Sequence, residues 1–336
     1  MAKRKERIDR GIKVRADSIY LLSSWQEILY LVFPRTLIFI FFLIIPLILS
    51  FSPYWQKVFL IICIYALLSI VFDFLANFVG LVCLGGAFFI GVGGYFSGML
   101  NKIFHFPIFL SIPVATILGA IFCTLLLIPT LSLRGVYFAI ITLMYPLLMT
   151  RLIEALNILG GTNGLLGIDG FSSLYGEIYS LSIVSLLFIF ALRRLTFEDI
   201  GLVIKAVKDN DQSVKASGIN PTHIRILSVF IASIIGCFAG AFLTHMYMWA
   251  GLSLFALDFS IIPIAATVIG GGGTLFGAVL GSIILVPLSE FLRDFGPLRI
   301  AIYSIILTIV IVYKSEGLLT YLTRKYNQFE RWVEVK

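Results

Sequence analysis

An acidic residue, Asp73, lies inside a long apolar stretch, where an ionisable group is costly to place. Such a group is by default a functional candidate, because a carboxyl can contact a polar solute or a coupling ion. Alternatively, Asp73 is protonated or hydrogen-bonded to a neighbouring helix and touches no solute. If the side chain lines a pathway, we expect its contact to be lost in Asp73→Leu and kept in Asp73→Asn.

The usual signatures of catalysis are missing from the sequence. It contains no GxxxxGK[ST] phosphate loop, no nucleophile elbow and no HExxH. Its three histidines, His105, His223 and His245, are far apart, and its four cysteines lie in apolar runs without CxxC spacing. We therefore expect no enzymatic activity from this chain alone, no cofactor and no metal, and we interpret the cysteines as small core residues.

A charged, helix-forming segment, residues 195–220, stands between two apolar stretches. Thr196 and Asp199 have capping-box spacing, which predicts a helix start with the threonine hydroxyl as cap. Apolar residues then recur at helical spacing, and a glycine and a proline predict the end of the structured segment. The residues in question are Ile200, Val203, Ile204 and Val207, opposite Lys205, Lys208 and Asp209, followed by Gly218 and Pro221. The pattern predicts one or two short amphipathic helices, which rest on lipid or dock into a partner protein.

The elements around this segment are apolar enough to cross a membrane. Hydrophobic residues make up 60% of the chain and charged residues 13%, with a mean hydropathy of +1.03, whereas soluble domains carry about 25% charged residues. A span needs roughly 20 apolar residues, which predicts an all-α polytopic protein with about ten spans, and eight as the lower limit. The predicted spans are 35–51, 58–79, 81–100, 107–128, 135–156, 176–192, 225–249, 259–271, 274–292 and 298–313. We split 259–292 at the four glycines 270–273, because consecutive glycines break a helix, and one half could be re-entrant.

The basic residues predict the orientation of these spans. With both termini inside, only Lys57, Lys102, Arg151, Arg293 and Arg299 fall outside, as the positive-inside rule favours. The net charge of +7 then needs no nucleic-acid partner. The predicted organisation is a basic cytoplasmic arm (1–34), a transmembrane domain (35–313) with a cytoplasmic loop (193–224), and a cytoplasmic tail (314–336).

Pairs of glycines four residues apart indicate where helices approach each other closely. We interpret them as packing glycines at helix interfaces. The three pairs are Gly94 with Gly98, Gly236 with Gly240, and Gly277 with Gly281.

The charged segment and five other blocks of sequence, together with this pattern of spans, resemble the permeases of ABC importers for branched-chain amino acids, a family that includes urea and short-chain amide importers. The resemblance covers about residues 60–320, and residues 201–220 look like the family's EAA-type coupling loop. This chain has Lys208 where the family has Arg, Asp211 where it has Glu, and Val214 where it has Ala. The other blocks are Leu84–Tyr95, Arg134–Leu143, Gly160–Ile168, Gly270–Gly281 and the ending Gly317–Leu319.

The resemblance implies a permease bundle in the cytoplasmic membrane of a prokaryote. It would translocate branched-chain or other hydrophobic amino acids; urea or short-chain amides are the alternative. The implied partners are cytoplasmic ATP-binding subunits, a second related permease, an extracytoplasmic substrate-binding protein and the lipid bilayer. The residues expected to couple the permease to the ATPase are Gly201, Lys205, Lys208, Asp211 and Gly218.

The substrate pathway is harder to predict. The family usually has Asn at Asp73 and Gly at Asn77, and these departures make both residues pathway candidates. The outer loop adds Gly161, Thr162 and Asn163, since glycines let backbone amides approach a carboxylate; a simple turn between two helices is equally consistent with the sequence. An ion-coupled secondary transporter built around Asp73 and the break at 270–273 is a less favoured reading.

Overall fold

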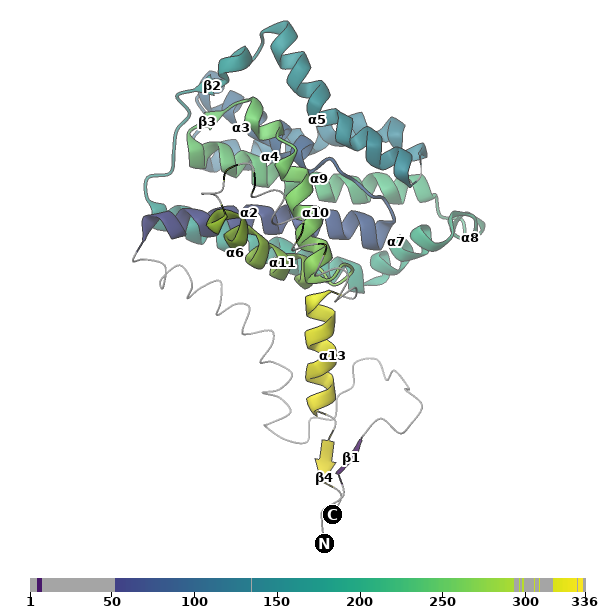
Figure 1. The fold of residues 1–336 in the computed structure, drawn as a ribbon. Coiled ribbons are helices and arrows are strands. Elements are labelled where there is room, and N and C mark those ends of the chain that lie inside the picture. Colours follow the sequence, from purple (N-terminus) through teal and green to yellow (C-terminus); the bar gives the residue numbers. More distant parts are fainter. Residues whose placement is uncertain are drawn as a thin grey trace.

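The fold is a bundle of long helices, seen in a computed structural model that describes residues 5–7, 52–133, 135–292, 296, 298, 305, 308, 317–330 and 332–334 (Figure 1). The predicted span 35–51, most of the predicted span 298–313, Arg134 and most of the arm 1–34 lie outside the described residues. The long helices are α2 (Pro53–Asp73), α3 (Gly86–Phe104), α4 (Ile108–Leu127), α5 (Val136–Leu156), α6 (Leu174–Phe197), α9 (Pro221–Tyr247), α10 (Asp258–Gly270) and α11 (Phe276–Phe291).

Each span predicted between residues 58 and 292 corresponds to one of these helices. Among the described residues, six stretches are long and apolar enough to cross a membrane, and α11 is a shorter apolar helix. The predicted break at the four glycines is confirmed, because α10 ends at Gly270 and α11 begins at Phe276. The chain is therefore a multi-pass membrane protein.

Short elements complete the fold. A π-helical turn (Phe74–Val79) continues α2, and a 3₁₀ turn (Leu252–Phe255) precedes α10. Two short helices, α7 (Asp199–Asp209) and α8 (Asp211–Ala216), lie between α6 and α9. The remaining elements are 3₁₀ turns Ile128–Ser132 and Gly161–Asn163, helix α13 (Leu318–Glu330), and strands β1 (Lys5–Arg7), β2 (Leu165–Leu166), β3 (Trp249–Ala250) and β4 (Trp332–Glu334), with β1 paired to β4 and β2 to β3, both antiparallel.

Glycines bring the helix backbones close together in the core. A Cβ placed on Gly240 of α9 would lie 2.1 Å from the Ile90 carbonyl oxygen of α3. A Cβ on Gly281 of α11 would lie 1.8 Å from the Ala266 carbonyl oxygen of α10. Both distances are far below van der Waals contact, so only glycine permits these helix pairs. The prediction of packing glycines is confirmed at both positions.

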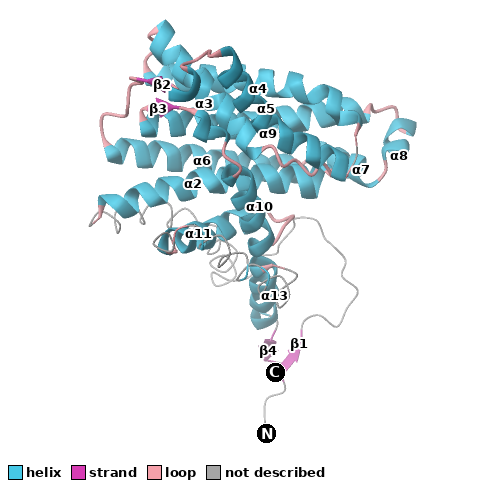
Figure 2. Cartoon of the chain, turned by 45° about the horizontal axis from the view of Figure 1, so that its top comes forward, coloured by secondary structure: helices cyan, strands magenta, loops and turns pink. Residues whose placement is uncertain are grey.

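Helix α10 crosses the bundle instead of following it. Figure 2 shows α10 running steeply across α2, whereas α6 and α9 lie alongside α2. α10 has 13 residues, about 20 Å at 1.5 Å per residue. It begins beside the middle of α2, where the Phe259 and Tyr65 rings stack with centroids 5.5 Å apart. The preceding 3₁₀ turn packs on α3 through Phe255 and Tyr95, so this irregular backbone is covered by protein, as a membrane requires.

The two ends of the bundle differ. Helices α7 and α8 cap one end, and the β2–β3 ladder lies at the opposite end (Figure 1). The π-helical turn packs on α7. The α10–α11 turn is held at Asp73, directly before that π-helical turn. The charged segment predicted from the sequence therefore lies next to the break between α10 and α11.

Candidate functional site

The start of α7 differs from the capping box predicted from the sequence. Helix α6 runs on to Phe197, and the Thr196 hydroxyl donates to the Arg193 carbonyl oxygen at 2.8 Å. The N-cap of α7 is Glu198, which makes no side-chain cap bond. The prediction was wrong because a threonine in a helix can satisfy its hydroxyl on a carbonyl one turn back, and here that bond competes with capping.

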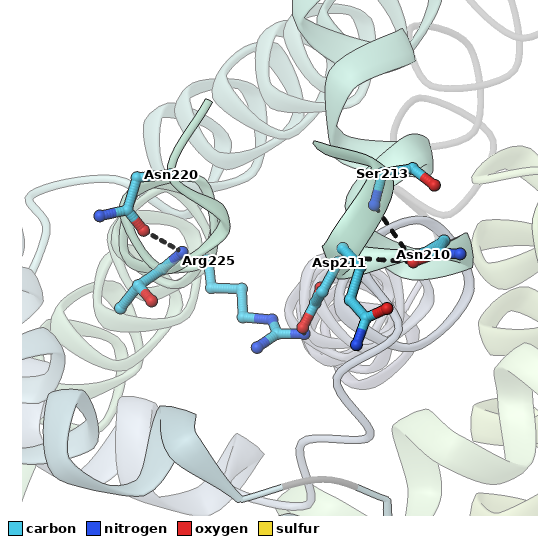
Figure 3. Close-up of polar contacts among 7 residues, drawn as sticks. Asn210, Asp211, Ser213, Asn220 and Arg225 are labelled. Carbon is cyan, nitrogen blue, oxygen red and sulfur yellow. Dashed lines mark hydrogen bonds and ion pairs between the residues drawn. The ribbon is translucent and has the colours of Figure 1, made fainter. Parts of the chain in front are cut away.

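The junction of α7 and α8 is made by Asn210. Its backbone leaves the helical region at φ −156°, and its side-chain oxygen accepts from the backbone N–H groups of Gln212 and Ser213, at 2.9 and 3.3 Å (Figure 3). Asparagine is a preferred N-cap because this oxygen satisfies amides that have no partner in the first turn. The charged segment therefore folds as two helices with a sharp corner between them.

The predicted stop at Gly218 is confirmed. Gly218 has φ +82°, and its N–H donates to the Lys215 carbonyl oxygen while the Ile219 N–H reaches back to Val214. These two bonds form a Schellman motif, which needs a left-handed residue at this position. Asn220 then caps α9 by accepting from the Thr222 N–H (Figure 3).

An ion pair fastens α8 to α9. Arg225 Nη2 donates to both carboxylate oxygens of Asp211, at 2.8 Å each, and the two side chains are only 14% and 9% exposed (Figure 3). Breaking a buried pair by removing one partner leaves an uncompensated charge, at a cost of about 3–5 kcal/mol. Asp211, which we expected at the ATPase contact, holds the corner in place from inside.

Helix α7 buries one apolar face and exposes another. Ile204 and Val207 are buried against the bundle, whereas Ile200, expected on the same face, is 49% exposed. Leu202 is 62% exposed and Phe197, at the end of α6, is 74% exposed. Ile200 and Leu202 belong to α7, which lies outside the candidate spans, whereas Phe197 is the last residue of the candidate span Leu174–Phe197. An exposed apolar side chain on such a short helix can contact a partner protein or lipid.

Gly201 sets the crossing of α6 and α7. A Cβ at this position would lie 2.4 Å from the Thr196 carbonyl group, which is backbone and cannot swing aside. Gly201 therefore allows α7 to turn directly against the end of α6. This contact gives a physical reason for the glycine that the sequence pattern singled out.

Lys205 and Lys208 extend back toward the end of α2. The Lys205 ammonium lies 5.5 Å from the ring centroids of both Phe78 and Phe197, within cation–π range. The Lys208 ammonium donates to the Asn77 carbonyl oxygen at 2.8 Å. Phe78 and Asn77 both belong to the π-helical turn, so the two lysines connect α7 to the end of α2.

Asp73 is fully buried and engaged by the turn between α10 and α11. Its Oδ1 accepts from the Gly273 N–H at 2.6 Å and from Asn77 Nδ2 at 2.7 Å, and its Oδ2 accepts from the Leu275 N–H at 2.8 Å. The hydrogen bonds to a neighbouring segment that the sequence allowed for are therefore present, and the pathway role stays a prediction. All three partners are donors, so Asp73 acts as an acceptor on both oxygens.

The remaining predicted pathway residues lie at the opposite end of the bundle. Gly161 is buried in a 3₁₀ turn, while Thr162 and Asn163 are exposed. Trp249 Nε1 donates to the Asn163 carbonyl oxygen at 3.1 Å, beside the β2–β3 ladder. The five predicted residues therefore form two separate groups: Asp73 and Asn77 near α7, and residues 161–163 at the far end.

A buried polar cluster near this far end was missed from the sequence. His245 Nδ1 lies 2.7 Å from the Asp169 carbonyl oxygen, and Nε2 lies 2.9 Å from Ser97 Oγ. A carbonyl can only accept, so Nδ1 carries the proton and, in the neutral ring, Nε2 accepts from the serine hydroxyl. Asn101 in turn binds both the backbone N–H and the side chain of Asp169. These residues come from α3, α9 and the outer loop, and no local spacing joins them.

The cysteines are all buried, as their apolar context predicted. Cys123 and Cys237 approach each other across α4 and α9 with Sγ atoms 3.9 Å apart, as free thiols. Within the part of the chain that the structure describes, no group of three or more His, Cys, Asp or Glu side chains is arranged to hold a metal ion.

Comparison with known proteins places this geometry in a family. The model of the family described as branched-chain amino acid transport system, permease component, matches residues 54–313. The high-affinity branched-chain amino acid transport system permease proteins LivM of Salmonella typhimurium and Escherichia coli are each 26% identical over 287 residues, covering 76% of this chain and 68% of the relative.

An archaeal relative agrees with the bacterial ones. The probable branched-chain amino acid transport permease protein LivM of Methanocaldococcus jannaschii is 25% identical over 291 residues, covering 73% of this chain and 83% of the relative. No solved structure matches this chain. The family match includes the whole α7–α8 corner, Asp73 and the α10–α11 turn, and this chain belongs to the family of permease components of branched-chain amino acid transport systems.

Proposed function

We propose that the chain is the transmembrane permease subunit of an ABC importer in a prokaryotic cytoplasmic membrane, and that the α7–α8 corner receives a cytoplasmic ATPase. ATP hydrolysis takes place on that partner. The observation that carries the proposal is that α7, outside the candidate spans, leaves the large apolar side chains of Ile200 and Leu202 exposed. Such a surface suits a helix that lies in a groove of another protein.

The way the corner is fastened also supports the proposal. A docking helix can transmit force only if its attachment to the spans is stiff. The Asp211–Arg225 pair joins α8 to α9, Lys208 joins α7 to the end of α2, and Gly201 lets α7 press on α6. Three long helices are thereby attached to one small surface, so a push at α7 would reach all of them.

The cargo we propose is a branched-chain or similar hydrophobic amino acid, as the names of the relatives suggest. An extracytoplasmic binding protein would deliver it at the β2–β3 end, opposite the ATPase. A second related permease would complete the pathway. Transport would then be a rigid-body switch of the helices between two packings.

The test is purification of the tagged chain in mild detergent from its native membranes. We expect an ATPase and a second permease to come down with it. Leu202→Glu should lower the co-purified ATPase at least ten-fold, because a charge would be buried in the contact. Leu166→Glu is the matched control, since Leu166 is a similarly exposed apolar residue, 59% exposed, at the opposite end. A wild-type chain that binds no ATPase would reject the proposal.

Uptake into vesicles holding the purified complex then tests the cargo. We expect competition by leucine-type amino acids and none by urea or acetamide. Uptake that depends on a proton gradient and not on ATP would indicate an ion-coupled transporter instead.

A further inference from the structure

The turn between α10 and α11 adopts backbone conformations that need support. Gly271 and Gly273 have φ +108° and +81°, which glycine tolerates. Leu275, however, has φ +55° although it is not glycine. Such a conformation is sparsely populated and persists only where its surroundings hold it. The Leu275 N–H and the Gly273 N–H are the two amides that Asp73 accepts.

The Asp73 carboxylate is also hydrogen-bonded to the π-helical turn, the segment that contacts α7. Asn77 donates to Asp73 Oδ1 through its side chain, and its carbonyl oxygen accepts from Lys208. A Cβ on Gly80 would lie 2.8 Å from Lys208 Cγ, so the lysine stem also packs on the end of this segment. A continuous chain of contacts thus runs from α7 through the π-helical turn to the α10–α11 turn.

The helical geometry along this route is itself unusual. Residues Phe74–Val79 are π-helical, and such turns occur often at functional sites. Opposite them, a Cβ on Gly272 would lie 2.6 Å from Asn77 Nδ2. The turn and the π-helical segment therefore fit against each other without space for a side chain between them.

We propose that Asp73 is a positioning residue that joins α7 to the α10–α11 hairpin, so that displacement of α7 moves the hairpin. The α10–α11 turn, the π-helical segment and α7 move as one unit. We call the hydrogen bonds of Asp73 to Gly273, Leu275 and Asn77 the joint, because they carry movement of α7 into α10, the helix that crosses the bundle. This inference rests on the proposed ATPase contact at α7 and adds the route by which that contact reaches the spans.

The chemistry of the joint makes the two simplest substitutions differ. Asp73→Leu removes all three acceptor contacts. Asp73→Asn keeps one acceptor oxygen but turns an NH₂ donor toward a backbone N–H, whichever way the amide is placed. We expect asparagine to weaken the joint and leucine to open it, so the expectation that asparagine preserves the contact holds only in part.

The experiment uses the complex purified from native membranes and measures two rates for each variant: ATP hydrolysis and amino-acid uptake. If Asp73 is the joint, Asp73→Leu should keep ATP hydrolysis within two-fold of wild type while uptake falls at least ten-fold. Asp73→Asn should be intermediate. Asp258→Asn, at an exposed carboxylate in the first turn of α10, is the matched control and should leave the ratio of the two rates unchanged.

A disulfide bridge can show whether Asp73→Leu loses uptake because the connection is broken or because the protein is generally destabilised. A Cβ on Gly273 would lie 3.9 Å from Asn77 Cβ, within the 3.5–4.5 Å range of disulfides. In the Asp73→Leu background, the Asn77→Cys/Gly273→Cys pair should recover uptake when oxidised and lose it when reduced. The single Gly273→Cys variant, which carries the same backbone strain without a bridge, should not respond to oxidation.

The outcomes distinguish the two proposals. Wild-type ATPase binding and ATP-driven uptake test the permease assignment, whatever the variants do. Unchanged coupling in Asp73→Leu would overturn the joint. If that variant does not assemble, Asp73→Asn and Lys208→Met are combined, since Lys208→Met removes the ammonium and keeps the stem. The quantity compared is the ratio of uptake to ATP hydrolysis. If the double variant lowers this ratio by the product of the two single effects, Asp73 and Lys208 act independently and the proposal is wrong. A double variant no worse than the more severe single variant supports the proposal.

Discussion

Polar side chains tie both ends of the bundle to the core, but in different ways. At the α7 end, the ties involve charged groups: Asp211 with Arg225, Lys208 with a carbonyl, and Asp73 with two amides of a strained turn. At the far end, the cluster centred on His245 joins helices α3 and α9 to the outer loop through the imidazole ring, a serine hydroxyl and the two contacts of Asn101 with Asp169.

This difference indicates that the two ends have different structural roles. Charged contacts to separate elements hold α7, α8 and the α10–α11 turn in place relative to one another, while Ile200 and Leu202 of α7 stay exposed. The His245 cluster instead holds a loop down on helices that already pack through glycines. We therefore expect damage at the α7 end to alter coupling, and damage at the far end to alter local order of the loop.

The largest expected effect comes from Asp211→Ala. It leaves Arg225 buried without its carboxylate, at a cost of about 3–5 kcal/mol, and should release α8 from α9. Hydrogen exchange of residues 210–220 should rise and co-purified ATPase should fall. Glu154→Ala is the control, because the Arg151 side chain of that pair is 83% exposed and exposed pairs contribute about 0–1 kcal/mol. Equal effects of the two substitutions would mean that the buried Asp211–Arg225 pair contributes no more than the exposed Arg151–Glu154 pair.

His245→Ala tests the far end. It leaves the Asp169 carbonyl without its side-chain donor, at about 1–3 kcal/mol for an unsatisfied group, while the Ser97 hydroxyl keeps Ser111 Oγ at 3.1 Å. Limited proteolysis should cut the loop 157–173 faster, while the amount of ATPase bound stays at the wild-type level. Loss of ATPase binding in this variant would mean that the two ends are not separable.

Gly218→Val sharpens the description of the α7–α8 corner. A β-branched residue at φ +82° is strained by about 1–2 kcal/mol, although a Cβ there meets nothing within 4 Å. We expect membrane insertion to be normal and ATP hydrolysis to be uncoupled from uptake. Gly218→Ala should show a weaker form of the same defect, and undiminished transport in the valine variant would count against a coupling role for this corner.

The smallest effect is expected from Thr196→Val, which keeps the shape of a side chain that is only 1% exposed. The threonine hydroxyl returns to a carbonyl of its own helix, so its removal should lower the free energy of unfolding of the purified complex by no more than about 0.5 kcal/mol, the low end for a hydrogen bond. A helix cap in the same place would cost about 1 kcal/mol. Asn210→Ala, which removes a real cap, is the comparison and should cause the larger shift.

Several parts of this structure could be predicted because their signals are local. Apolar stretches of span length, the stop at Gly218 and the break at 270–273 all depend on the chemistry of a few consecutive residues. The structure agrees at Gly218, at the break and, between residues 58 and 292, at the predicted spans. The capping box at Thr196 failed although it is also local, because two local hydrogen bonds competed and spacing alone does not rank them. The exposure of Ile200 was missed because helical spacing defines faces but does not say which face meets the bundle.

By itself, the sequence determined that this is a helical membrane protein, that a helix ends at the glycines 270–273, and which family the chain belongs to. Hydropathy and the order of motifs can be read along the chain. The tertiary structure alone decided which groups Asp73 contacts and that residues 161–163 lie far from it. It also decided that Lys205 and Lys208 reach back to the end of α2. The reason is physical: these contacts join residues up to about 200 positions apart, and only the packing of α2 against α7, α10 and α11 brings their donors to their acceptors.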